Sequence, residues 1–150
     1  MTEGAPNVSS GPPDRTRYFS GGIWETAYGY CRAMQVGRSV FVSGCTSMVE
    51  GRVRHPADPG AQVRVALQTA ATALAEFGAG FEHVVRTRMY VTHRRDCDAV
   101  GRVHAEVFGA SPPVATMIIV SGLLHPDMRA EIEIEAVLPD GTADQPADRE

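Results

Sequence analysis

The stretch Ala130-Glu131-Ile132-Glu133-Ile134-Glu135-Ala136 indicates the fold more directly than any other part of the sequence. Its apolar and acidic residues alternate strictly, which is the period of a β-strand with one buried face. The two isoleucines therefore belong to the core side, and the three glutamates share the opposite side. A strand of this kind needs other elements to cover its apolar face.

Two amphipathic segments supply that cover. The first has Asp58 as N-cap and Pro59 at the first helical position, and its apolar residues recur at spacings of three and four until Gly78 ends it. The second runs from about Asp96 to Phe108, with Gly109 as C-cap. Strands are predicted at Tyr30–Val36, Ser39–Ser43, Val84–Thr92, Thr116–Val120 and Arg129–Val137, with a weaker one near Tyr18–Trp24. This order predicts an α+β protein in which both helices pack on one face of a single mixed sheet.

The segment Met117-Ile118-Ile119-Val120, released by the double proline Pro112-Pro113, is predicted to be a buried strand. It is apolar on both alternating faces, although two helices can cover only one face of the sheet. We therefore expect another subunit to bury the second face.

Composition limits the classes of function. The net charge is −4, which argues against nucleic acid as a partner because phosphate-backbone binding needs a basic face. All 14 basic residues are arginine, so Schiff-base chemistry on lysine is excluded. No apolar run is long enough to cross a membrane and no leader is recognisable, so a cytoplasmic location is expected. Three cysteines without metal-ligand spacing predict reduced thiols and no metal site.

The chain is expected to fold as one domain over residues 17–138. Residues 1–16 and 139–150 are rich in Pro, Gly, Asp and Thr and are interpreted as flexible tails.

The acidic face of residues 130–136 allows two interpretations. The simpler one is a solvated strand face. If that face instead meets a partner subunit, at least one of the glutamates lies in a partly desolvated cleft with a raised pKa, which suits it to moving a proton.

Three groups of segments occur in a characteristic order: Gly29-Tyr30 with residues 36–44, then residues 85–92, then Pro113-Val114-Ala115-Thr116 leading to residues 132–136. Together they resemble the RidA (YjgF-type) family of reactive-intermediate deaminases, which is also called endoribonuclease L-PSP. The resemblance covers about residues 17–138. It implies a chorismate-mutase-like fold, a homotrimer with its sheets around a central barrel, and pockets for a small molecule at the subunit interfaces.

The resemblance also implies a reaction, the hydrolysis of enamines and imines to a 2-keto acid and ammonia, without a cofactor. It assigns the water-positioning glutamate to Glu133, the pocket tyrosine to Tyr30, and a backbone contact to Ser43-Gly44. The arginine that holds the substrate carboxylate in active members corresponds to Ala115 here. A guanidinium group supplies charge-assisted hydrogen bonds worth about 1.5 to 3 kcal/mol each, and alanine supplies none. We therefore expect little activity on 2-aminoacrylate, and a neutral or larger intermediate of a specialised pathway as substrate.

Further candidates follow from their positions. Arg88 shares a strand face with Tyr90; it either pairs with a glutamate of the last strand at the surface or replaces the cation missing at position 115. Cys45 after the Ser-Gly turn is interpreted as packing or pocket lining ahead of a nucleophile. Further expected pocket residues are Trp24, His104, Thr116 and Met117, although His104 and Trp24 also fit a role in the core.

Two other functions stay open: a binding or regulatory trimer without catalysis and, less favoured, a ribonuclease.

Overall fold

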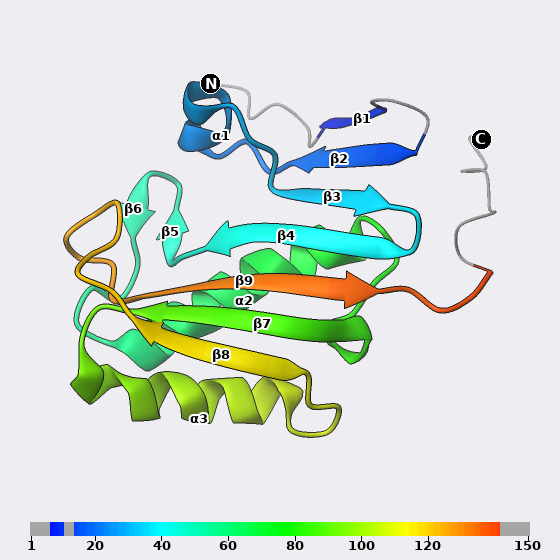
Figure 1. The fold of residues 1–150 in the computed structure, drawn as a ribbon. Helices are drawn as coiled ribbons and strands as arrows, with labels where there is room; N and C mark the ends of the chain where they lie inside the picture. The colour runs from blue at the N-terminus through cyan, green and yellow to red at the C-terminus, as the bar shows by residue number, and fades with distance from the viewer. Residues whose placement is uncertain (1–6, 11–13, 142–150) are drawn as a thin grey trace.

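The computed structural model describes residues 7–10 and 14–141, which form a seven-stranded mixed sheet with its two longer helices behind it (Figure 1). The strand order is β1-β2-β3-β4-β9-β7-β8. These strands are β1 (Asn7–Ser10), β2 (Arg15–Phe19), β3 (Ala33–Val36), β4 (Ser39–Cys45), β7 (Val84–Val91), β8 (Val114–Ile119) and β9 (Ala130–Val137). The remaining elements are the hairpin β5 (Met48–Val49) and β6 (Arg52–Val53), the helices α1 (Ile23–Tyr28), α2 (Pro59–Ala75) and α3 (Cys97–Phe108), and two 3-10 turns at Phe81–His83 and Arg94–Asp96.

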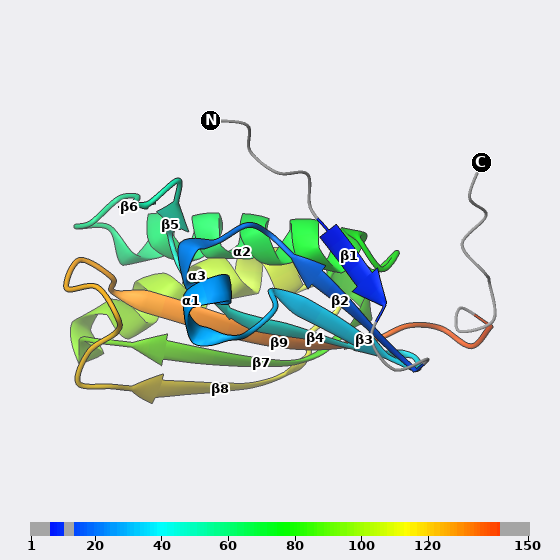
Figure 2. The same cartoon turned by 90° about the horizontal axis from the view of Figure 1, so that it is seen from above.

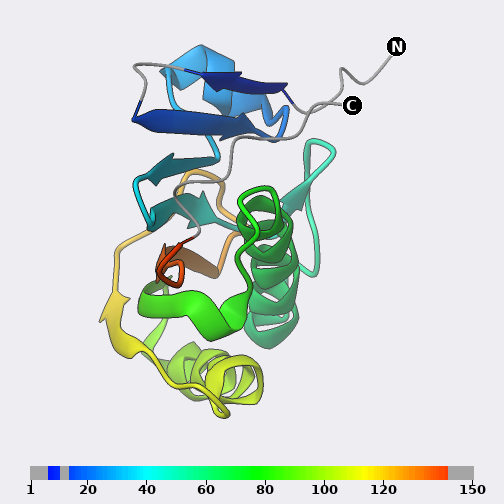
Figure 3. The same ribbon diagram turned by 90° about the vertical axis from the view of Figure 1, so that its right-hand side faces the viewer.

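The strand pairs explain the position of α3. β7 and β8 are parallel, whereas every other neighbouring pair in this sheet is antiparallel. A parallel pair needs a crossover connection, and α3 supplies it. The helices α2 and α3 lie on the same side of the sheet, as Figures 2 and 3 show from two directions. The predicted mixed sheet with both helices on one face is confirmed, and none of the described helices is long and apolar enough to cross a membrane.

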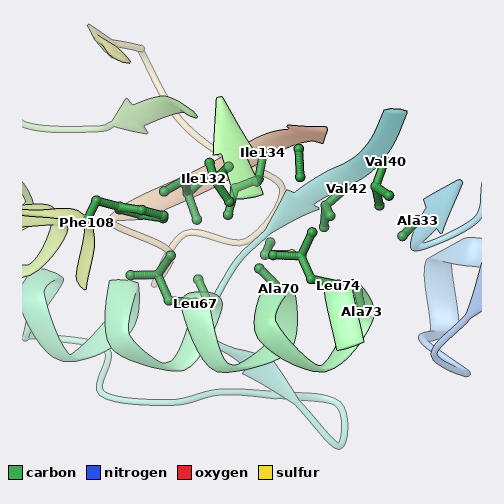
Figure 4. Close-up of a cluster of buried hydrophobic side chains, with 14 of the residues drawn as sticks. Ala33, Val40, Val42, Leu67, Ala70, Ala73, Leu74, Phe108, Ile132 and Ile134 are labelled. Carbon is green, nitrogen blue, oxygen red and sulfur yellow. The ribbon is translucent and has the colours of Figure 1, made fainter. Parts of the chain in front are cut away.

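The core lies between β9, its neighbouring strands and α2. Ile132 and Ile134 are buried at 0% and 2% exposure, whereas the three glutamates between and beside them are half-buried, so the predicted alternation is confirmed. Leu67 and Leu74 of α2 point toward these isoleucines from the helix side (Figure 4). The helix begins as predicted, since the Asp58 side chain accepts a hydrogen bond from the Ala61 backbone amide at 3.0 Å.

A buried glutamine links this core to the loop before β9. Gln62 of α2 is fully buried, and its side chain donates to the carbonyl oxygens of His55 at 3.0 Å and Asp127 at 2.8 Å. Its own oxygen accepts a hydrogen bond from the Arg129 backbone amide at 2.8 Å. Because these polar atoms are paired, the loop that leads into β9 is held against the helix.

The N-terminal part differs from the prediction. β1 and the start of β2 fall within residues 1–16, which were expected to be a flexible tail. The strand predicted at Tyr18–Trp24 is also wrong at its end, because Ile23 and Trp24 begin the short helix α1. The structural reason is edge pairing: β2 is added to β3 through backbone hydrogen bonds, which need no apolar periodicity. Residues 1–6, 11–13 and 142–150 of the predicted tails lie outside the described residues.

The strand after the double proline is less covered within one chain than the buried strand that the sequence predicts. β8 pairs only with β7 and forms an edge of the sheet, and Val114, Ile118 and Ile119 are 58%, 44% and 41% exposed within this chain. Only Met117 packs against the core. The sequence predicts that another subunit covers the second face of this strand; that face is open in one chain, and its cover by another subunit stays a prediction.

Candidate active site

A cavity of about 450 Å³ opens beside α1, near the last residues of β4 and the first residues of β9. Its wall combines residues from the N-terminal third of the chain with residues from β9 and the loop before it. It is lined by Ser20, Gly22, Ile23, Trp24, Tyr30, Arg32, Ser43, Gly44, Cys45, Thr46, Met48, Thr69, Leu124, Met128, Glu131 and Glu133.

Tyr30 reaches the cavity because α1 ends immediately before it. Gly29 has a φ of 74°, a left-handed conformation that glycine adopts without steric cost. The backbone amides of Gly29 and Tyr30 both donate to the carbonyl oxygen of Glu25, each at 3.0 Å. Trp24 lies one helical turn before Tyr28 and stacks on it, with the ring centroids 6.5 Å apart. The cavity therefore has two aromatic rings, Trp24 and Tyr30, in its wall.

Arg32 is the cation of the cavity wall. It is 8% exposed, and its Nη1 atom donates to the carbonyl oxygen of Gly44 at 2.7 Å. Its Nε atom lies 3.5 Å from the carboxylate of Glu25, which is itself 3% exposed. That carboxylate also accepts hydrogen bonds from the backbone amide and the hydroxyl group of Ser20. Arg32 and Glu25 thus form a buried ion pair between α1 and the sheet.

The Ser43-Gly44 segment lies in a β-bulge between β4 and β9. Val42 pairs with Ile134 but Cys45 pairs with Ile132, so β4 carries one more residue than its partner over this interval. The Ser43 amide donates to the Arg32 carbonyl oxygen at 2.9 Å, and its hydroxyl group donates to the Cys31 carbonyl oxygen at 2.7 Å. The backbone amide and the hydroxyl group of Ser43 therefore both donate their hydrogen bonds within the chain.

The bulge brings Gly44 against Glu131. A Cβ atom at position 44 would lie 1.9 Å from Glu131 Oε1, so glycine is required for this carboxyl group to occupy its place. Burial raises the pKa of Glu131, and the negative charge of Glu133 raises it further, while Arg32 acts in the opposite direction. The sequence predicts a raised pKa for a glutamate of this strand if a partner subunit covers its face; within one chain, burial already raises the pKa of Glu131.

Glu133 is anchored by the neighbouring strand. The Tyr90 hydroxyl group donates a hydrogen bond to its carboxylate, and Arg88 Nη1 lies 3.8 Å from the same oxygen. Arg88 makes its shorter ion pair, 3.0 Å, with Glu135. The pairing of Arg88 with glutamates of the last strand matches the first of the two interpretations of Arg88, and Arg88 and Tyr90 do not line the cavity.

The structure separates the other candidates. Trp24, Tyr30, Glu133 and the segment 43–45 lie together at the cavity, while Thr116 and Met117 are on β8 outside its lining. Ala115 pairs with the buried Thr87, whereas Glu133 pairs with Arg88. Within one chain, Ala115 and Glu133 therefore lie on opposite faces of the sheet.

His104 lies away from the cavity. Its Nε2 atom is 2.8 Å from the hydroxyl group of Thr87, and its ring packs on Phe108 with centroids 4.6 Å apart. Burial lowers its pKa. Cys45 is 1% exposed, and burial raises the pKa of its thiol, which disfavours the thiolate that a nucleophile requires. In the described chain no cluster of three His, Cys, Asp or Glu side chains is placed to hold a metal ion.

The sequence interpretation missed Arg32, the ion pair that Glu25 makes with it, and the separate role of Glu131. Arg32 follows the predicted pocket residue Tyr30 by two positions. The sequence interpretation placed it in the predicted strand Tyr30–Val36 and assigned no partner to its charge. The only local signal for the position of Glu25 was its spacing of four residues from Gly29, because this spacing is typical of a helical turn that ends at a glycine.

Comparison with known proteins decides the family. Residues 24–138 match the family model described as Endoribonuclease L-PSP. The chain belongs to this family, which includes the YjgF and RidA proteins. It is 42% identical over 120 residues to the uncharacterized protein SCO2049 of Streptomyces coelicolor, covering 80% of this chain and 90% of that protein. It is 31% identical over 104 residues to the 3-aminoacrylate deaminase RutC of Acinetobacter baylyi, covering 69% of this chain and 82% of RutC.

Solved structures of the family show the same fold. The crystal structure of Rv2704 from Mycobacterium tuberculosis, a member of the YjgF/YER057c/UK114 family, has a TM-score of 0.75 at 40% sequence identity, over 83% of this chain and 99% of Rv2704. The protein YJGH has a TM-score of 0.73 at 27% identity, over 85% of this chain and 98% of YJGH. The predicted chorismate-mutase-like fold is therefore confirmed.

Proposed function

We propose that this L-PSP family member hydrolyses the C=N bond of a small imine, or of an enamine that tautomerises to one, in the cavity beside α1. The observation that carries the proposal is Glu133, a carboxylate at the cavity that Tyr90 and Arg88 hold in place. A relative that is 31% identical is a 3-aminoacrylate deaminase, which is an enzyme of this reaction class.

The proposed reaction needs one water molecule and one group that moves protons. Glu133 accepts a proton from the water as its oxygen adds to the imine carbon and the C=N π electrons move to nitrogen. Glu133 returns that proton to nitrogen, which gives a carbinolamine. The proton of the carbinolamine hydroxyl group then passes through Glu133 to the nitrogen, the C=O bond forms as the C–N bond breaks with its electron pair on nitrogen, and a carbonyl compound and ammonia are released. The Trp24 and Tyr30 rings offer flat surfaces for a planar C=N group.

We further propose that the protein acts as a homotrimer of the family's kind. Phe41 on the sheet face away from the helices is 45% exposed, and Ile118 on β8 is 44% exposed. Exposed apolar side chains on this scale mark a surface that another copy can cover. The expected location is the cytoplasm, and the expected ligand is a small molecule.

The test compares two sources of imine. An amino-acid oxidase generates imines that carry a carboxylate, and an amine oxidase generates imines that lack one; semicarbazide trapping then measures how fast each imine disappears. We expect the protein to accelerate hydrolysis of an imine without a carboxylate, and Glu133→Gln to abolish the acceleration with the fold intact. We expect little pyruvate and ammonia from 2-aminoacrylate released by a serine dehydratase, because position 115 is alanine.

Two results would contradict the proposal. Unchanged hydrolysis by Glu133→Gln would remove Glu133 from the mechanism. Absence of acceleration with every imine and enamine in the set, by a protein that still binds small molecules in the cavity, would favour a binding or regulatory protein instead.

A further inference from the structure

The charges at the cavity can be assigned pair by pair. Arg32 is committed to Glu25 at 3.5 Å and to the Gly44 carbonyl oxygen at 2.7 Å. One positive and one negative charge, both buried, therefore cancel in this part of the wall.

Arginines also balance the negative charges of the two glutamates farther along β9, Glu133 and Glu135. Arg88 lies 3.0 Å from Glu135 and 3.8 Å from Glu133, and Arg86 lies 3.8 Å from Glu135. Two guanidinium groups thus face two carboxylates, and Glu133 additionally receives the Tyr90 hydrogen bond.

Glu131 is the carboxyl group that remains. Among the described residues, none donates a hydrogen bond to its side chain or forms an ion pair with it within 4 Å, although it lines the cavity. It is half-buried, and Gly44 leaves the space that its Oε1 atom occupies. The cavity therefore contains one carboxyl group more than its arginines neutralise.

Arg32 offers no free donor to a ligand. Its Nε atom is buried and lies 3.5 Å from the Glu25 carboxylate, so the ion pair with Glu25 already involves it. Glu131 is therefore the charged group of this wall that has no ion-pair partner among the described residues.

We propose that this cavity selects ligands that carry a protonated nitrogen and no carboxylate, with Glu131 as the partner of that nitrogen. The chemical class is a primary ammonium or an iminium group on a planar or aromatic body. The inference deepens the proposed function, because a protonated imine without a carboxylate belongs to this class.

Binding of three matched probes tests the charge preference without any reaction. Benzylamine is a cation, benzamide is neutral and benzoate is an anion, and all three have the same ring to place against Trp24 and Tyr30. Chemical-shift changes of the ¹⁵N-labelled full-length protein give the affinity of each probe. We expect benzylamine to bind most tightly and benzoate most weakly, and Glu131→Gln to lower benzylamine affinity about tenfold, the equivalent of about 1.4 kcal/mol, while benzamide affinity stays the same.

Glu135→Gln is the matched control, because it removes a carboxylate from the same strand face outside the lining of the cavity. We expect it to leave benzylamine affinity within about twofold of wild type, since Glu135 is already paired with Arg88 and Arg86 and does not line the cavity. An equal loss in both variants would mean that overall charge attracts the amine, and would overturn the assignment to Glu131.

The opposite charge preference has its own signature. If Arg32 replaced the arginine missing at 115, benzoate would bind best and Arg32→Gln would remove its binding; this result would overturn the inference and leave imine hydrolysis possible. Failure of all three probes to bind would also overturn it. Conversely, Glu131-dependent amine binding without any hydrolysis would retain the inference and remove the proposed reaction.

Discussion

The guanidinium group of Arg32 donates a hydrogen bond to the carbonyl oxygen of Gly44 at 2.7 Å, and so joins the residue before β3 to the bulge in β4 at the cavity wall. The same side chain neutralises the buried Glu25. This one residue therefore supports both the docking of α1 and the shape of the cavity.

Arg32→Met is expected to destabilise the protein by about 3 to 5 kcal/mol, because it leaves Glu25 as an uncompensated buried charge. Urea unfolding at pH 7 measures the change. The double variant Arg32→Met/Glu25→Gln should recover a large part of the loss, since the second substitution removes that charge. A double variant less stable than Arg32→Met would show that the pair does not account for the effect.

Gly44→Ala is expected to displace the Glu131 carboxyl group at a small cost in stability, because the new Cβ atom would lie 1.9 Å from Glu131 Oε1 and the end of this flexible side chain can turn into the cavity. Urea unfolding measures the cost, and benzylamine affinity reports the displacement. Gly101→Ala is the matched control: its Cβ atom would meet only Met117 Cε at 3.7 Å, and alanine inside α3 should add about 0.5 to 1 kcal/mol. Equal effects of the two substitutions on benzylamine affinity would contradict the close contact at Gly44.

Glu131→Gln is expected to make the protein more stable relative to wild type as the pH rises. Burial and the charge of Glu133 raise the pKa of Glu131 above its ordinary value of 4.5, and Arg32 only partly opposes them. The favourable contribution of the protonated group is complete below the unfolded pKa and is lost as the pH rises through the folded pKa. Unfolding of both proteins at pH 4, 6 and 8 measures the difference, which should grow from the first value to the last. A constant difference would show that Glu131 is not desolvated.

His104→Gln is expected to weaken the loss of stability on acidification. Burial lowers the pKa of His104 from 6.5, so its neutral form contributes stability that is complete above the unfolded pKa and is lost as the pH falls through the folded pKa. Glutamine retains a polar partner for the Thr87 hydroxyl group but does not titrate. Melting temperatures between pH 7.5 and 5 provide the comparison, and parallel curves for the two proteins would refute the prediction.

Tyr90→Phe is expected to lower kcat for imine hydrolysis about tenfold or more with little change in KM. Tyr90 bonds to Glu133 but does not line the cavity, so it positions the carboxylate without touching the substrate. A hydrogen bond to a charged group is worth about 1.5 to 3 kcal/mol. Tyr28→Phe is the control, because Tyr28 is 66% exposed and stacks only on Trp24. A change confined to KM would assign Tyr90 to substrate binding instead.

Local patterns in the sequence were sufficient for the elements that carry the core. The alternation in residues 130–136 predicted which face of β9 is buried, and Asp58-Pro59 predicted the start of α2, because these signals depend on neighbours only a few residues apart. The edge strands β1 and β8, and the strand β2 beside β1, were harder to predict from the sequence. Backbone pairing specifies them, and the exposed or buried state of β8 depends on what lies beyond this chain.

The sequence by itself determined the family, the two-layer fold and the placement of Glu133 and Tyr30 at one site. Only the tertiary structure showed that Arg32 is neutralised by Glu25, and that Glu131 at the same cavity has no such partner. The physical reason is register: one extra residue in the bulge between Val42 and Cys45 sets Gly44 against Glu131. Gly44 and Glu131 are about 90 positions apart in the sequence, and no periodicity in the sequence records their close approach.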